Sequence, residues 1–465
     1  MQVSAAEVPA SIFRAYDIRG VVGKTLSAEV AYWVGRAVAS EARDRGVEQL
    51  VVGRDGRHSS PELAAAIASG MNDSGCDVVD IGQAPTPIMY FATHELQTGS
   101  GIAVTGSHNP PDYNGMKVMI AGDTLSGKAI TDLYERIRDG RLHTGSGKVE
   151  QRTDLVDLYI RRICADIRPQ RPLHLILDAG NGVAGAIAPR LFRELGCSVE
   201  ELYCDVDGDF PNHHPDPAEP ENLHTLIERV KSSGADLGLA FDGDGDRLGV
   251  IDSQGKIIWP DRQLMLYAQD VLSRRPGEAV VFDVKCSMHL ARVIEAAGGQ
   301  PQMSRTGHSL IKATLRASGA PLAGEMSGHT FFVERWYGFD DGIYTGARLI
   351  EIVAADGRSS AEIFAELPEG VSTPELKVKV EEGEQQQLME ALISEGERRF
   401  PEAAIHTIDG IRVEWPDGWG LIRASNTTPV LVVRFEANDD QGLARIRGAF
   451  EELLASVKPG LEIPA

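Results

Sequence analysis

Short apolar runs that end in aspartate recur at three places along the chain, and each is followed by a polar or glycine-containing loop. These runs lie at 50–55, 173–178 and 280–283. A second apolar run follows in each section, at 102–104, 237–241 and 321–323, with helix-like segments between the runs. Strands that alternate with helices are typical of α/β domains with largely parallel sheets. The sequence therefore predicts three similar α/β domains in one chain.

The second run of each section leads into a loop that is rich in chemically active side chains. The three loops lie at 105–110, 242–247 and 324–329. Ligands of α/β sheets gather at the carboxyl ends of the strands. We therefore expect the three domains to direct these loops into one shared cleft. Glycine-rich turns are common in any α/β protein, so chance similarity is the alternative interpretation of the repeat.

The chain of 465 residues is too long for one core, and its length suggests about three or four domains. Polar or Gly/Pro-rich stretches at 139–148, 252–255 and 367–374 are the candidate boundaries. Beyond the last boundary, 376–380 alternates with period two, and a helix-like stretch rich in Glu and Gln follows. This change of pattern predicts a smaller α+β domain. The expected domains are therefore 1–150, 151–255, 256–368 and 369–465.

Composition and charge exclude several classes of protein. The net charge of −22 argues against a general affinity for nucleic acid or for anionic membranes. No apolar run approaches the ~18 residues of a membrane span, and the start of the chain lacks the pattern of a secretory signal. The five cysteines have no paired metal spacing, so we expect them to be reduced and the protein to be cytoplasmic. An anionic substrate would need a local basic pocket in this acidic chain.

Three aspartates that alternate with glycines form the most specific motif of the chain. Asp242, Asp244 and Asp246 follow an apolar run, and glycine lets the backbone turn tightly enough for the carboxylates to converge. Crowded carboxylates repel one another unless a cation lies among them, and hard oxygen ligands suit Mg²⁺. A calcium EF-hand is excluded because Arg247 and Ser253 occupy the sixth and twelfth loop positions. The motif predicts a phosphate-handling metal site, with a surface acidic turn as the alternative.

Ser107 lies in the loop that follows the run at 102–104. Pro110 disfavours the helical conformation for Asn109, so the segment stays a loop that can expose the serine hydroxyl. A hydrolase triad would need the spacing G-x-S-x-G, which this loop lacks. A serine that carries a phosphoryl group beside Mg²⁺ fits better, although a plain turn or cap residue is the alternative.

The charge of such a site requires nearby cations. Three carboxylates, one Mg²⁺ and a phosphoserine sum to about −3. The candidates to offset this charge are Arg247, Lys117 and Arg19, each of which would be an ordinary surface charge on its own.

The segment 423–429 packs one arginine, three hydroxyls and one amide into seven residues. Arginine forms bidentate contacts with phosphate, and hydroxyl groups can satisfy the remaining phosphate oxygens. An ordinary polar turn before the strand expected at 430–435 is the alternative.

Four of these motifs together resemble the α-D-phosphohexomutase superfamily. They are Thr-Gly-Ser-His-Asn-Pro, Asp-Gly-Asp-Gly-Asp-Arg, Gly-Glu-Met-Ser-Gly-His and Arg-Ala-Ser-Asn-Thr-Thr-Pro, in the order of that family, and the resemblance covers essentially the whole chain. The chain is most similar to the bacterial phosphomannomutase/phosphoglucomutase branch. The phosphoglucosamine mutase branch typically reads Gly-Glu-Gln-Ser-Gly-His and Arg-Pro-Ser-Gly-Thr-Glu. This chain differs from that branch at Met326 and at 426–428.

The resemblance implies four domains around one central cleft, of which the first three are similar α/β domains with mixed sheets and the fourth is a smaller α+β domain. It also implies a role for each candidate residue. The domains would be the phosphoserine, metal-binding, sugar-binding and phosphate-binding domains, in chain order. Ser107 would be phosphorylated and would bind Mg²⁺ together with Asp242, Asp244 and Asp246. The implied catalytic residues are Ser107, His329, His308, Lys117, Arg247 and Arg19, with His329 as the first choice for general acid/base, followed by His308 and Lys117. The implied substrate-binding residues are Tyr16, Lys285, Glu325, Ser327, His329, Arg423, Ser425, Asn426 and Thr427.

The implied reaction is the reversible interconversion of hexose 6-phosphate and hexose 1-phosphate, for both mannose and glucose. It would pass through the phosphoserine and a hexose 1,6-bisphosphate, which would also be the activator. The partners would be small sugar phosphates, with no nucleic acid and no membrane, and we expect a monomer. Phosphoglucosamine mutase, a metal phosphatase and a non-catalytic sugar-phosphate-binding paralogue are the alternatives. We assign the acidic, histidine-containing loop 207–215 to structure near a domain interface rather than to metal, and we expect hinge motion about 367–374.

Overall fold

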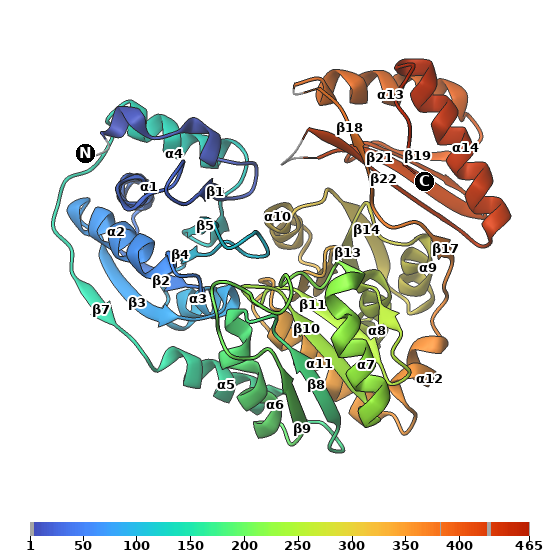
Figure 1. The fold of residues 1–465 in the computed structure, drawn as a ribbon, viewed down its shortest axis with the longest axis horizontal. Coiled ribbons are helices and arrows are strands. Elements are labelled where there is room, and N and C mark those ends of the chain that lie inside the picture. Colours follow the sequence, from blue (N-terminus) through green and yellow to red (C-terminus); the bar gives the residue numbers. More distant parts are fainter. Residues whose placement is uncertain (1–3, 382, 426–428, 465) are drawn as a thin grey trace.

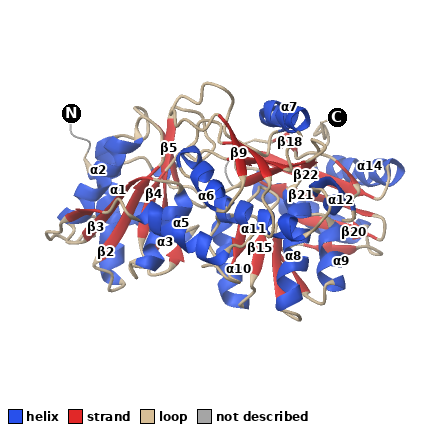
Figure 2. Ribbon diagram, turned by 90° about the horizontal axis from the view of Figure 1, so that it is seen from below, coloured by secondary structure: helices blue, strands red, loops and turns tan. Residues whose placement is uncertain are grey.

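Four sheets, one after another along the chain, form four units in the computed structural model (Figure 1), which describes residues 4–381, 383–425 and 429–464. Helices lie on both sides of the strands in the view of Figure 2. The boundaries expected near residues 150, 255 and 368 stay predictions.

The first unit is built on a seven-stranded sheet. Its strands are β1 Ile18–Val21, β2 Gln49–Arg54, β3 Asp77–Gln83, β4 Gly101–Val104, β5 Tyr113–Ile120, β6 Asp123–Thr124 and β7 Val149–Gln151. Its helices are α1 Ala28–Asp44, α2 Ser60–Asp73, α3 Thr86–Glu95 and α4 Lys128–Arg138.

The second and third units carry smaller sheets of five and four strands. The second unit comprises α5 Leu155–Asp166, β8 His174–Asp178, α6 Ala188–Glu194, β9 Ser198–Leu202, α7 His224–Ser233, β10 Leu237–Phe241, β11 Leu248–Asp252 and β12 Ile257–Ile258. The third comprises α8 Pro260–Arg274, β13 Ala279–Asp283, α9 Met288–Ala296, β14 Gln300–Ser304, α10 His308–Ser318, β15 Leu322–Gly324, β16 Thr330–Phe332, α11 Gly342–Ala355 and α12 Ser360–Ala365.

The predicted threefold repeat is confirmed by the pairing of the strands. In each of the first three sheets, one strand (β2, β8 or β13) pairs in parallel with a strand on each side. One of these neighbours (β4, β10 or β15) then pairs in antiparallel with the next strand of the chain. The sheets are therefore mixed, and the three chemically loaded loops all follow the equivalent strands β4, β10 and β15.

The fourth unit is the smaller α+β domain that the period-two pattern predicts. Its antiparallel strands are β17 Val371–Ser372, β18 Leu376–Lys379, β19 Ala404–His406, β20 Ile411–Trp415, β21 Gly418–Ala424 and β22 Val430–Ala437, with helices α13 Gln385–Arg399 and α14 Asp440–Val457. In β18, Leu376 and Val378 are buried against the apolar core of this unit, whereas Lys377 and Lys379 are exposed. Alternating burial of this kind is typical of a strand with one face on the core.

Helix α11 joins the second and third units into one core. It is apolar on most of its surface, and it packs on β10 and β11 of the second sheet as well as on β16 and α8 of the third unit. The buried apolar cluster is consequently continuous from the first unit to the third, whereas the fourth unit has a cluster of its own. Among the described residues, none of the helices combines the length and the apolar character that a membrane crossing requires.

Close packing of α1 on α2 depends on a glycine in the first unit. A Cβ atom on Gly35 of α1 would lie 2.3 Å from the backbone oxygen of Ile67 in α2. No real Cβ makes so short a contact, so any side chain would push the two helices apart.

We expect the substitution Gly35→Ala to lower the free energy of unfolding by about 1–3 kcal/mol, the usual cost of overpacking, although alanine is the better helix former. Gly448→Ala is the matched control, since among described atoms none lies within 4 Å of the added Cβ in α14. The control should raise the free energy by up to about 1 kcal/mol. Urea denaturation followed by circular dichroism measures both, and equal effects of the two substitutions would contradict this packing argument.

Candidate active site

A buried arginine fixes the backbone of the loop that carries Ser107. The Arg57 guanidinium donates hydrogen bonds to the backbone oxygens of Ser107 at 2.8 Å and of Asn109 at 2.6 Å. Asp55, at the carboxyl end of β2, accepts from the Arg57 Nε at 3.2 Å and from the Gly106 N–H at 3.0 Å. Ser107 itself has a φ of +48°, a left-handed conformation that is uncommon for a serine. This network therefore fixes a strained turn that presents the hydroxyl.

A similar contact between an aspartate carboxylate and a loop backbone N–H occurs in the third unit. Asp283 ends β13, the strand equivalent to β2, and its carboxylate accepts from the Met326 N–H at 3.2 Å. The aspartate that ends the first apolar run of these two sections thus anchors the loop that follows the neighbouring strand.

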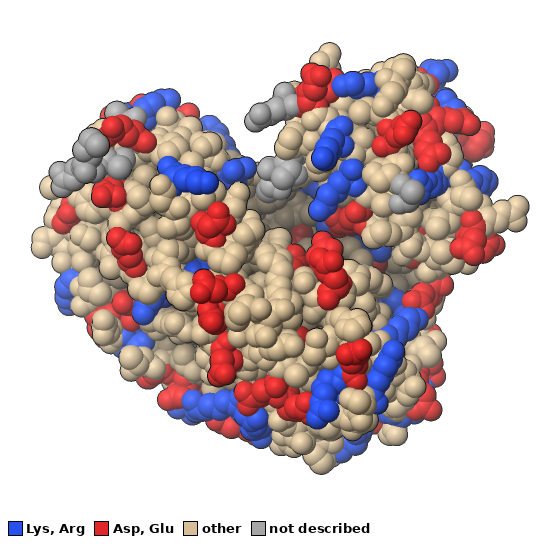
Figure 3. All heavy atoms as spheres, in the orientation of Figure 1, with Lys and Arg blue, Asp and Glu red and all other residues tan. Residues whose placement is uncertain are grey.

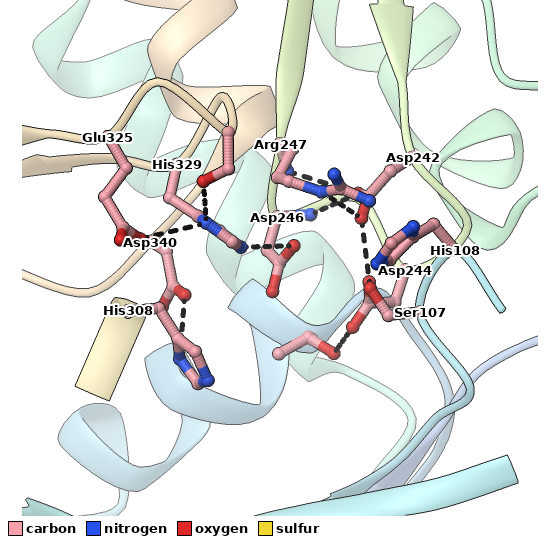
Figure 4. Close-up of polar contacts among 12 residues, drawn as sticks. Ser107, His108, Asp242, Asp244, Asp246, Arg247, His308, Glu325, His329 and Asp340 are labelled. Atoms are coloured by element: carbon pink, nitrogen blue, oxygen red, sulfur yellow. Dashed lines mark hydrogen bonds and ion pairs between the residues drawn. The ribbon is translucent and has the colours of Figure 1, made fainter. Parts of the chain in front are cut away.

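The three aspartates of the metal motif converge in a fully buried cluster. Asp242, Asp244 and Asp246 are all 0% exposed, and carboxylate oxygens from the three lie within 4.8 Å of one another. The Ser107 hydroxyl donates to Asp242 Oδ2 at 3.2 Å (Figure 4). A Cβ on Gly243 would lie 2.3 Å from the Ser107 backbone oxygen, so glycine is required for this close approach of the two loops. The structure thus brings together the serine and the three carboxylates from two different units.

Two buried cations from separate units offset the negative charge of the cluster. Lys117 of β5 contacts Asp244 at 2.8 Å and also contacts Asp246. Arg247 contacts Asp242 at 2.9 Å and Asp216 at 3.2 Å. Both side chains are about 95% buried, with 4% exposure each.

The surroundings shift the pKa values of Asp242 and Asp246 in opposite directions. Burial, followed by repulsion from Asp246, raises the pKa of Asp242 to about 7. Burial also favours a raised pKa for Asp246, but the attraction of Lys117 and then of His329 outweighs it and holds that pKa well below its usual range. Asp242, the carboxylate that faces Ser107, is thus the one at which burial and repulsion outweigh the attraction of Arg247.

These residues fit a small, hard divalent cation. Asp244 Oδ1 is buried and has no hydrogen-bond partner within the described part of the chain. A buried carboxylate oxygen without a donor is costly unless a cation approaches it. Asp242, Asp244 and Asp246, with an oxygen on Ser107, form a donor set of the type that Mg²⁺ prefers.

A second set of polar side chains surrounds His329, which follows β15. The His329 Nε2 atom lies 3.4 Å from Asp246, while Nδ1 lies 3.1 Å from Glu325 and 2.9 Å from the Ser327 hydroxyl. Burial lowers the pKa of His329, but Asp246 and Glu325 outweigh burial and raise it to about 10. The loop 324–329 therefore holds an imidazolium next to the carboxylate cluster.

His308 has the opposite electrostatic environment. Its ring centre lies 5.7 Å from that of His329 (Figure 4). Burial and then the positive charge of Lys312 lower the pKa of His308, in spite of Asp340 at 3.3 Å. One neutral and one protonated imidazole therefore lie side by side at neutral pH.

The space-filling view shows a hollow between the first and fourth units (Figure 3). The candidates Tyr16 and Arg423 come from these two units. Tyr16 donates to the Thr306 backbone oxygen at 2.8 Å, beside His308. Arg423 donates to Asp409 at 3.0 Å, and Asp409 accepts from the Thr306 N–H at the same distance. Both residues thus meet at the loop that precedes α10.

Three further candidates are held by their own neighbours. Lys285 contacts Glu375 of the fourth unit at 2.6 Å, and Arg19 pairs with Asp17. The Ser425 N–H donates to the Val430 backbone oxygen at 3.0 Å. Asn426 and Thr427 lie outside the described residues.

Sequence reasoning missed several residues of the site. Asp216 links Arg247 to His108, which lies 2.7 Å from it, and Asp340 links His308 to Lys312. No local pattern marks either aspartate, since their partners are distant in sequence.

The segment 206–210 packs on 56–58 of the first unit, where a Cβ on Gly56 would lie 2.2 Å from Val206.

We expect the substitution Asp242→Asn to stabilise the metal-free protein at high pH. The pKa of about 7 is above the ordinary aspartate value of 3.8, so the stability contributed by the protonated carboxyl is complete below about pH 4 and is lost as pH rises through 7. The variant escapes this loss, and it should be more stable than the wild type by about 1–3 kcal/mol at pH 8 but not at pH 4. Urea denaturation in excess EDTA at both pH values measures the difference. The exposed Asp112→Asn is the control, and a pH-independent difference for Asp242→Asn would refute the argument.

Comparison with known proteins agrees with this geometry. Four family models match in order: phosphoglucomutase/phosphomannomutase alpha/beta/alpha domains I, II and III over residues 10–143, 157–255 and 259–371, and the C-terminal domain over residues 375–453. The phosphomannomutase/phosphoglucomutase of Pseudomonas aeruginosa is 54% identical over 99% of both chains, and the phosphoglucomutase of Neisseria gonorrhoeae is 51% identical over 97% of this chain and 98% of that one. The crystal structure of a phosphoglucomutase/phosphomannomutase family protein from Burkholderia thailandensis superposes with a TM-score of 0.94 at 54% identity, covering 98% of this chain and all of that one. The chain therefore belongs to the phosphoglucomutase/phosphomannomutase family.

Proposed function

We propose that this protein reversibly converts hexose 6-phosphates into hexose 1-phosphates, with glucose and mannose as the sugars and Ser107 as the phosphoryl carrier. The observation that carries this proposal is the contact between the Ser107 hydroxyl and the buried carboxylate cluster, with Arg247 and Lys117 beside it. The names of the similar proteins support the same reaction.

In the proposed reaction, the free hydroxyl of the sugar phosphate attacks the phosphorus atom of phosphorylated Ser107. The new bond from phosphorus to the sugar oxygen forms as the bond to Ser107 Oγ breaks, and the proton of the hydroxyl passes to a base. The product is the 1,6-bisphosphate, which turns end for end in the cleft. Ser107 Oγ then attacks the other phosphoryl group, and the released sugar oxygen takes a proton from an acid.

The two imidazoles are our candidates for this base and acid. His308, with its lowered pKa, is neutral and can accept a proton, and His329, with its raised pKa, can donate one. Groups whose environments push their pKa values apart are typical of acid/base pairs. Lys117 follows them as a third candidate, although its pKa is raised well above the usual range once the nearby aspartates outweigh its burial.

Asp242, Asp244, Asp246 and Ser107 would hold Mg²⁺. When bound, the ion would neutralise negative charge on the transferring phosphoryl group. Arg247 and Lys117 contribute fixed positive charge at the same place, and such preorganised charge stabilises a transition state without rearrangement. Arg19 completes the set of cations around the transferred group.

Substrate recognition in this proposal is divided mainly between the third and fourth units, with Tyr16 added by the first. Glu325 and Ser327 bind the sugar hydroxyls, with His329 beside them. The phosphate that does not react is held by Arg423, Ser425, Asn426 and Thr427, with Tyr16 and Lys285 at the rim. Because this clamp must accept either phosphate of the intermediate, we expect the fourth unit to move about 367–374.

The proposal extends to the metal, the activator, the oligomeric state and the location. We propose Mg²⁺ as the metal, a hexose 1,6-bisphosphate as the activator, a monomer as the working form and the cytoplasm as the location. The five cysteines are free of disulfides, which agrees with a reducing compartment. The domain boundaries at 150, 255 and 368 belong to this proposal as well.

Substitution Ser107→Ala tests the central proposal. It should lower kcat by at least about a thousandfold, because the phosphoryl carrier is lost. Intact-mass analysis of active wild-type enzyme should show one phosphate that maps to Ser107 and is absent from the variant. The exposed Ser273→Ala on α8 is the matched control and should keep full activity. Near-normal turnover of Ser107→Ala would exclude the carrier role.

The second prediction concerns the sugar. Glucose and mannose differ only at C2. Hydrogen bonds from O3 and O4 to Glu325 and Ser327 would therefore not discriminate between the two sugars. The intermediate must also bind in two opposite orientations, so a strong hydrogen bond to O2 in one orientation would leave a buried group unpaired in the other, at a cost of ~1–3 kcal/mol.

We therefore expect kcat/KM for glucose 1-phosphate and mannose 1-phosphate to agree within about a thousandfold, or ~4 kcal/mol in transition-state binding, with the bisphosphate present. A larger preference would mean that the site reads C2. Glucosamine phosphate should be the poorest of the three, and a preference for it would favour the phosphoglucosamine mutase alternative.

A further inference from the structure

Thr86 connects the first unit to the metal motif of the second. It is the first residue of α3 and is 1% exposed. Its hydroxyl donates to Asp244 Oδ2 at 2.5 Å, and its backbone N–H donates to the Asp244 backbone oxygen at 2.9 Å. One residue of the first unit therefore fixes both the backbone and the side chain of a carboxylate in the second.

The hydrogen bonds divide the two oxygens of Asp244 unequally. Oδ2 accepts from Thr86 and from Lys117, whose Nζ lies 2.8 Å away. Oδ1 is buried and is without a hydrogen-bond partner as far as the described residues extend. A carboxylate whose one oxygen is held by two donors can offer only the other oxygen to an ion.

Thr86 is better suited than Lys117 to set this orientation. Lys117 lies on a long, flexible side chain and also contacts Asp246, so it can follow either carboxylate. The hydroxyl of Thr86 is one rotatable bond from the backbone, and a β-branched side chain is stiff at that bond.

The start of α3 is itself held against the metal loop. A Cβ on Gly245 would lie 3.3 Å from the Cβ of Pro85, so the two segments are in contact. The N-terminus of a helix carries partial positive charge, which favours the nearby carboxylate of Asp244. The position of Thr86 relative to Asp244 is thus fixed by packing as well as by hydrogen bonds.

We propose that Thr86 is a positioning residue for the metal ion: it holds Oδ2 of Asp244, so that Oδ1 is the oxygen presented to the ion. This inference rests on the proposed function, because it assigns a metal to the cluster. It implies that the metal site is complete only while the first unit is docked on the second. It gives Thr86 no contact with substrate.

The test compares Thr86→Val, which keeps the shape and removes the hydroxyl, with Thr86→Ser, which restores a hydroxyl. Binding of Mn²⁺ to the full-length, dephosphorylated protein is measured by titration with electron paramagnetic resonance. We expect the dissociation constant to rise about tenfold or more in Thr86→Val, as is usual when a partner of a metal ligand is lost. Thr86→Ser should stay within about threefold of the wild type.

Thr93→Val is the matched control on the same helix. Thr93 is fully buried and donates to the Tyr90 backbone oxygen at 2.7 Å, away from the metal motif. Its loss should lower thermal stability equally with and without Mn²⁺ and should leave Mn²⁺ binding unchanged. In Thr86→Val, by contrast, the rise in melting temperature that Mn²⁺ produces should shrink. If Thr86→Val does not fold, Thr86→Ala provides the same comparison without the added methyl group.

Mn²⁺ affinity of Thr86→Val within about twofold of the wild type would overturn the proposal. Equal weakening in Thr86→Ser and Thr86→Val would also overturn it, because the hydroxyl would then not be the active group. A wild-type protein that bound no Mn²⁺ would instead contradict the proposed function itself, so the two failures are distinguishable.

Discussion

The ion pairs of Lys117 with Asp244 and Asp246 couple the charge of the carboxylate cluster in the second unit to the position of the first unit. Buried carboxylates at such short separations repel one another, and burial penalises each charge further. The compensating ammonium comes from β5 of the first sheet, so the cluster is balanced only when the two sheets are docked. Replacing a buried ionic cluster with apolar residues often stabilises a protein, which argues that this cluster is kept for chemistry rather than for stability.

A repeated scaffold lets three loops carry different chemistry. Asp55 and Asp283 end equivalent strands and anchor the neighbouring loop through a backbone N–H, at Gly106 and Met326 respectively. The anchored loops nevertheless present a serine in one unit and a glutamate, a serine and a histidine in the other. Because the anchor uses backbone groups, the side chains of each loop are free to differ. The same frame can thus place the proposed phosphoryl carrier and the proposed hydroxyl-binding groups at equivalent positions of two units.

The sequence allowed the repeat and the convergence of the three aspartates to be predicted, because local signals mark them. Apolar runs that end in aspartate mark the strands, and alternating glycines force Asp242, Asp244 and Asp246 together. Local signals do not mark Thr86 or Asp216, whose partners lie more than 100 and about 30 residues away and meet them only after the units dock. The position of helix α11 could not be predicted either, because an apolar surface does not indicate which two sheets the helix packs on.

The contact between the third and fourth units combines buried hydrogen bonds with a small apolar cluster, formed by Val284, Met288, Trp419 and Leu421. Arg412 donates to the Val284 and Cys286 backbone oxygens at 2.6 and 2.7 Å, and Ser287 donates to Glu436 at 2.7 Å. Water can replace such hydrogen bonds when the units separate, whereas a large apolar interface would lose its burial energy. By contrast, a core shared through α11 unites the second and third units. Because this apolar cluster is much smaller than the core shared by the second and third units, we propose that the fourth unit is the part that opens and closes over the cleft, as the proposed release and rebinding of either end of one intermediate would require.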